Sequence, residues 1–192
     1  MTDSAARKNK QIYNNIISSD SRPFNMKIRH INQQMDLITD NYSQYYALLE
    51  RPFKCTCCCL ARPEMTAKSN STTFGKVIEP FSCCDPLYHV IDNQNQIKWK
   101  VSADCCQCGF WCPCSEAIFP IISSGKNDFD PNKSDGYIKK TNAGVQEMVS
   151  DATNFEIVFP VNATPVEKFL LIATVLMIDY RYFEKDAGKN NN

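Results

Sequence analysis

The residues of this sequence best suited to chemistry are its eleven cysteines, which fall into three groups at 55–59, 83–84 and 105–114. Thiols in proteins bind metals, form disulfides, carry acyl chains or pack as small apolar side chains. The first ten residues are polar and show no secretory signal, so we expect an intracellular chain with reduced thiols. Metal ligation, acylation and burial therefore remain as uses for the cysteines.

The third group, CCQCGFWCPC, could supply four thiolates to a zinc ion from Cys106, Cys108, Cys112 and Cys114. Zinc sites ordinarily take paired ligands spaced as C-x2-C, with a second pair at a defined distance. This group departs from that spacing, so zinc is not expected here. Cys83 and Cys84 suit burial as small apolar residues.

The first group is too crowded for zinc, because adjacent side chains of an extended chain point to opposite faces. Acylation tolerates crowding and needs only accessible thiols near a bilayer. One acyl chain gives marginal membrane binding and two give stable anchoring, at about 0.8 kcal/mol per buried methylene. We therefore predict lipidation at Cys55, Cys57, Cys58 and Cys59.

Nothing in the sequence indicates bond chemistry. It contains no Ser/His/Asp arrangement and no glycine-rich phosphate loop, so we predict that the chain is not an enzyme. The 21 basic and 21 acidic residues cancel, and this neutral balance gives no reason to expect a nucleic-acid partner.

The elements that must position the cysteines include one helix. The longest apolar run, 169–178, has ten residues, whereas a membrane span takes about 20. Thr164 is a suitable N-cap and Pro165 suits the first helical position. We predict a core helix rather than a span, with Phe169, Leu170, Leu171, Ile172, Val175, Leu176 and Ile178 in the core.

Strand patterns dominate the rest of the chain. Apolar and polar residues alternate over 24–29, and 87–91 with 97–101 predict a hairpin. Pro120 predicts an edge strand or a bulge, and 33–45 reads as a surface helix or a loop. Further strands are predicted at 45–51, 116–122, 136–140 and 154–159. Residues 1–20 and 185–192 read as polar tails around one domain at 21–184.

Seven short motifs, taken in order, resemble the phospholipid scramblase family. They are SRPFNMKI at 21–28, LERPFKCTCCC at 49–59, FGKVI at 74–78, CCQCG at 105–109, GYIKKTNAG at 136–144, SDATNFEIVFP at 150–160 and MIDYRYFE at 177–184. The resemblance implies a mainly β, tubby-like antiparallel barrel around one hydrophobic C-terminal helix. The N-terminal barrel strands of the family are missing here, so we expect a barrel that is incomplete and has open edges. Either the N-terminal segment KQIYNNIISS replaces these strands, or a second copy or another protein covers the gap, or the sheet is a partial shell.

The resemblance also implies calcium as a cofactor. The segment 151–162 matches the family's proposed calcium loop, with ligand positions at Asp151, Thr153, Phe155, Ile157, Phe159 and Asn162. Calcium prefers several carboxylates, a glycine at the sixth place and an acid at the twelfth. Here Asp151 is the one acid among these positions and Glu156 replaces the glycine, so the residues favour a core strand over a calcium site.

The activity implied by the resemblance is movement of phospholipids between bilayer leaflets by a protein held to the membrane through acylated cysteines. The alternative is a membrane-tethered structural or scaffold subunit without lipid transport. The expected location is an intracellular membrane surface, with the plasma membrane first and a mitochondrial membrane as the alternative.

Overall fold

One open antiparallel sheet forms most of the molecule. The computed structural model describes residues 24–29, 35–39, 45–51, 62–69, 72–112, 115–141 and 152–183. Ten strands join in the order β1-β10-β9-β8-β7-β6-β5-β4-β3-β2. Their bounds are β1 Phe24–Arg29, β2 Met35–Thr39, β3 Tyr45–Glu50, β4 Glu64–Ser69, β5 Thr72–Ile78, β6 Leu87–Asp92, β7 Ile97–Ser102, β8 Ala117–Ser123, β9 Gly136–Thr141 and β10 Ala152–Val158.

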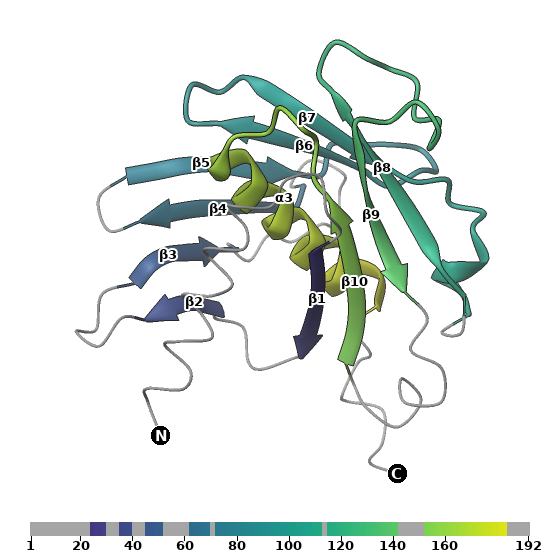
Figure 1. Cartoon of the computed structure of the whole chain (residues 1–192), viewed down its shortest axis with the longest axis horizontal. Coiled ribbons are helices and arrows are strands. Elements are labelled where there is room, and N and C mark those ends of the chain that lie inside the picture. The colour runs from purple at the N-terminus through teal and green to yellow at the C-terminus, as the bar shows by residue number, and fades with distance from the viewer. Residues whose placement is uncertain are drawn as a thin grey trace.

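The sheet curls around a long helix, α3 (Pro165–Ile178), as Figure 1 shows. Strands β4 and β5 lie on one side of the helix, and β1 and β10 lie on the other. Although β1 and β2 are neighbours in the chain, they form the two edges of the sheet order. The prediction of a mainly β, incomplete barrel around a C-terminal helix is confirmed.

The start of α3 is fixed by a capping box. The Glu167 amide donates to Thr164 Oγ1 at 3.3 Å, and the Thr164 amide donates to Glu167 Oε2 at 2.9 Å. Pro165 occupies the first turn, where its missing N–H costs nothing. The helix ends in a π-helical turn, η2 (Asp179–Phe183).

Every residue of α3 from Leu170 to Ile178 is buried. Phe169 is half-buried and packs edge-on against Phe74, with ring centroids 6.2 Å apart. Gly75 on β5 lies directly under the helix, and a Cβ there would come within 2.8 Å of Leu170 Cδ1. The sheet therefore approaches α3 closely where β5 carries no side chain.

The inward faces of strands β4 to β10 complete the core, because successive side chains of a strand point to opposite faces of the sheet. Trp99 and Val101 on β7 are buried, as the predicted hairpin requires. A cluster of rings from Phe110, Phe155 and Phe183 closes the core near η2, with centroids 5.9 Å apart in both pairs that involve Phe183.

Two local predictions are wrong. Pro120 lies on β8, an interior strand between β7 and β9, and its register with Tyr137 is continuous with that of its neighbours. The proline is tolerated because β8 pairs with β7 only from Ile121 to Ser123. Position 120 therefore lies outside the β7–β8 pairing, and the N–H that proline lacks is not needed there. Within 33–45, the structure has strand β2 instead of a helix or a loop.

Candidate functional site

The three connections that carry the cysteine groups begin and end at strand ends on one side of the sheet. In an antiparallel sheet of sequential strands, every second connection lies at the same end. The register pairs Glu64 with Ile78 and Leu87 with Ser102, so the connections 51–63, 79–86 and 103–116 share an end. These three connections contain all eleven cysteines of the chain. We call this end the thiol-bearing end.

The predicted lipidation sites, Cys55, Cys57, Cys58 and Cys59, lie outside the described residues. The residues on either side of this segment, Arg51 and Arg62, are described by the structure. Arg51 lies over the ring of Tyr180 on η2, with its guanidinium carbon 3.5 Å from the ring centroid. The 51–63 connection therefore leaves the sheet beside the C-terminal end of α3.

A buried carboxylate holds the other flank of the same connection. Glu79 is 4% exposed, and Arg62 Nη2 donates to its Oε1 at 2.7 Å. Arg62 Nε also donates to the Glu79 carbonyl at 3.1 Å, and Arg181 Nε lies 4.0 Å from the same Oε1. Because both basic groups face one buried acid, removal of Glu79 would leave two cations without their partner.

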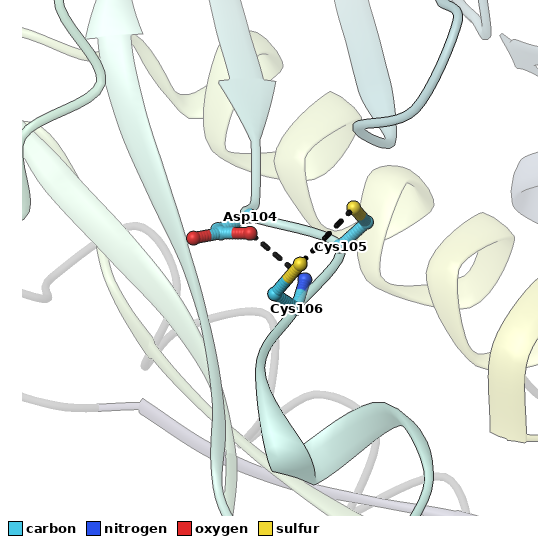
Figure 2. Close-up of side chains that lie close together, drawn as sticks. All are labelled: Asp104, Cys105 and Cys106. Carbon is cyan, nitrogen blue, oxygen red and sulfur yellow. Dashed lines mark hydrogen bonds between the residues drawn. The ribbon is translucent and has the colours of Figure 1, made fainter.

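The second and third cysteine groups meet at this end. The Cys105 and Cys106 sulfur atoms lie 3.8 Å apart in the turn that follows β7. Asp104 Oδ1 accepts a hydrogen bond from the Cys106 amide at 2.8 Å, as Figure 2 shows. Asp85, from the 79–86 connection, accepts a bond from the Cys105 amide at 3.1 Å.

The surroundings of Cys105 and Cys84 raise the pKa of each thiol and favour its protonated form. A thiol–thiol hydrogen bond with Cys106, desolvation and the Asp85 carboxylate raise the pKa of Cys105 to about 11. A hydrogen bond with the Cys83 thiol, followed by the charges of neighbouring groups that include Asp85 and Cys106, raises the pKa of Cys84. A nucleophilic cysteine needs the opposite shift, because the thiolate is the reactive form. The raised pKa values of Cys105 and Cys84 therefore give no support for covalent catalysis by these thiols.

Two large aromatic side chains project from the same connections. Phe81, between β5 and β6, is 65% exposed, and Trp111, next to the short helix η1 (Cys108–Phe110), is 84% exposed. Aromatic side chains with this exposure are typical of surfaces that contact a membrane interface or a partner. The sequence alone could not identify them, because exposure depends on which residues of each connection fold inward.

The predicted calcium positions follow a strand. Thr153, Phe155, Ile157 and Phe159 are buried, and the first three belong to β10, which pairs with β1 and β9. Asn162 is exposed in the turn before α3, and Asp151 lies outside the described residues. This is the arrangement of a core strand, whose inward side chains face apolar neighbours rather than an ion. Calcium binding at this segment stays a prediction.

Within the described part of the chain, no helix has both the length and the apolar character needed to cross a membrane.

Comparisons with known proteins agree on one family. A family model described as Scramblase matches residues 4–185. The chain is 28% identical to phospholipid scramblase 4 of Homo sapiens over 159 residues, which cover 80% of this chain and 46% of that protein. It is 30% identical to phospholipid scramblase 1 of Homo sapiens over 174 residues, with coverages of 88% and 49%.

Phospholipid scramblase 2 of Bos taurus is 28% identical over 174 residues, which cover 88% of this chain and 53% of that protein. The chain thus spans about half the length of the curated relatives it matches. No solved structure matches the chain significantly.

Proposed function

The chain belongs to the scramblase family, and from that premise we propose that it moves phospholipids between bilayer leaflets while its thiol-bearing end faces the membrane. The single observation that supports this orientation is that the three connections whose sequences contain the eleven cysteines all begin and end at the same end of the sheet. Lipid movement makes and breaks no bond. The protonated thiols of the described cluster are consistent with a role outside covalent chemistry.

Acylation at the first cysteine group supplies the anchor in this proposal. Two acyl chains give stable attachment, whereas one chain gives marginal binding. Phe81 and Trp111 add apolar surface beside the anchor. Full burial of each side chain in the interface would contribute about 1.5–3 kcal/mol. The aromatic side chains thus orient the protein, and the acyl chains hold it in place.

Because α3 is enclosed by the sheet, this helix is not the path for lipid headgroups. A headgroup must cross about 30 Å of hydrocarbon. We therefore assign lipid movement to local disturbance of the bilayer by the anchored end, produced by several copies acting together. The plasma membrane is the proposed location, with a mitochondrial membrane as the alternative.

The proposal is tested with the acylated full chain in liposomes that carry a fluorescent phospholipid in both leaflets. A membrane-impermeant reductant bleaches the outer leaflet, so scrambling converts a half loss of signal into a complete loss. We expect complete loss with the wild type. The matched control replaces Cys55, Cys57, Cys58 and Cys59 with Ser and should leave half of the signal. A half loss with the acylated wild type refutes intrinsic scrambling.

The open sheet supports a second candidate, a membrane-tethered scaffold subunit. Strands β1 and β2 each have one neighbour among the described strands, and a strand edge with unpaired backbone groups pairs readily with another chain. In this case the acylated chain would bind a partner at that edge and leave labelled lipid in its original leaflet.

A further inference from the structure

We propose that the Asp104–Cys106 turn forms a site for a thiolate-preferring divalent cation, of which zinc is the representative, with water completing its coordination. The inference goes beyond the proposed lipid movement and uses cysteines outside the predicted lipidation group. Its starting point is the turn drawn in Figure 2, where one carboxylate and two thiols lie together on consecutive residues.

The separation of the two sulfur atoms fits such an ion. Two thiolates bound to one tetrahedral zinc ion, each at about 2.3 Å, lie about 3.8 Å from one another. The Cys105 and Cys106 sulfur atoms are 3.8 Å apart. One ion can therefore bind both thiolates without movement of the backbone.

The turn itself supplies a third donor. The ligand atoms of Asp104, Cys105 and Cys106 all lie within 4.8 Å of one another. Together these residues offer two sulfur atoms and one carboxylate oxygen, and one water molecule would complete a tetrahedral set. A donor set rich in sulfur selects zinc-like ions over calcium and magnesium.

The backbone around the donors is fixed before any ion binds. The Cys105 and Cys106 amides donate to Asp85 and Asp104, respectively. The Gln107 side chain then bridges to β8, because its Nε2 donates to the Ile118 carbonyl at 2.9 Å and its Oε1 accepts from the Ile118 amide at 2.7 Å. A metal site with supported ligands loses little entropy when the ion binds.

The two connections are also tied to one another directly. Ser102 Oγ and the Ala103 amide both donate to the Pro86 carbonyl, at 2.8 Å and 3.3 Å. This contact fixes the distance between the 79–86 and 103–116 connections. An ion bound by the Asp104–Cys106 turn would stiffen the connection that carries Trp111, beside the connection that carries Phe81.

This ligand set differs from the one that cysteine spacing suggested. Cys108 begins η1 with an exposed side chain, and its carbonyl accepts a hydrogen bond from the Cys112 amide at 2.8 Å. Among the described residues, the group around Cys105 is the one whose donor atoms converge. The spacing rule missed it because its ligands are consecutive residues of one turn rather than spaced pairs.

The test uses the full chain with Cys55, Cys57, Cys58 and Cys59 replaced by Ser, which removes competing thiols. Zinc affinity is measured by competition with a chromophoric chelator, and cobalt substitution reports tetrahedral thiolate ligation through its visible spectrum. We expect one zinc ion per chain. The double variant C105S/C106S should lower the affinity by at least about 100-fold and remove the cobalt–thiolate bands.

Two further variants separate this site from other thiols. Asp104→Asn, in the same turn, should also lower zinc affinity by at least about tenfold. Cys108→Ser is the matched control, with an exposed thiol on the same connection, and should leave the affinity within about threefold of the parent, since a lost ligand costs more than this. Absence of stoichiometric zinc in the parent would overturn the proposal, as would zinc that is lost with Cys108→Ser but kept in C105S/C106S. Far-UV circular dichroism of each apo variant confirms that the fold is intact.

Discussion

The substitution Leu170→Ala tests whether helix α3 is packed inside the protein core. Leu170 is fully buried, and its Cδ1 lies over Gly75, where β5 has no side chain that could move into the space. Leu170→Ala therefore leaves a cavity that neighbours cannot fill. Buried Leu→Ala changes cost about 2.7–5 kcal/mol, with the larger values where the cavity stays open. We expect about 3–4 kcal/mol.

A loss of this size is readily measured in a chain of 192 residues. It lowers the melting temperature by about 6–16 °C, at about 2–4 °C per kcal/mol for a protein of this size. Urea unfolding of the purified chain without detergent, followed by circular dichroism, gives the free energy directly. Val166→Ala is the matched control, because Val166 lies in the first turn of the same helix and is 39% exposed. If both variants lose less than about 0.5 kcal/mol, α3 is not packed inside the sheet and the account of the core is refuted.

The remaining predictions concern the anchor, the helix cap and one turn. Replacement of Cys55, Cys57, Cys58 and Cys59 by Ser should move the protein from the membrane to the soluble fraction of cell lysates, and membrane retention of that variant would contradict acylation as the anchor. Thr164→Ala removes the acceptor for the Glu167 amide and should cost about 0.5–2 kcal/mol in urea unfolding, whereas Thr164→Ser should cost little. Hydrogen bonds from Gln96, and then the Lys98 ammonium, lower the pKa of Asp92 below its ordinary value of 3.8. Ionised Asp92 therefore stabilises the β6–β7 turn above the unfolded-state pKa, and this stability is lost as the pH falls through the lower folded-state pKa. Asp92→Asn should therefore reduce the loss of unfolding free energy that the wild type shows as the pH falls in the acid range. An unchanged pH dependence would contradict the stabilising role of ionised Asp92.

The helix and most strands could be predicted from the sequence because their signals are local. An apolar run flanked by charged residues and started by Thr164-Pro165 specifies a short buried helix with little dependence on distant residues. Alternation over 97–101 likewise specifies which face of β7 is buried. The family resemblance then indicated how these elements assemble.

The candidate site could not be predicted in the same way. The contact of Asp85 with the Cys105 amide depends on which connections share an end of the sheet, and that follows from the strand count between them. Pro120 misled the strand assignment because its tolerance depends on where pairing with β7 begins. Both features are set by register, which a local pattern does not contain.

The two tryptophans of the chain offer the most direct test of the account as a whole, since one is buried and the other projects from the thiol-bearing end. Trp99→Phe leaves only Trp111, which is 84% exposed, and Trp111→Phe leaves only Trp99, which is 8% exposed. The acylated variants are bound to vesicles whose acyl chains carry bromine, a quencher that acts on contact. The account predicts that bromine quenches Trp111 and leaves Trp99 unaffected. Quenching of Trp99, or a Trp111 emission identical with and without brominated lipid, would contradict it.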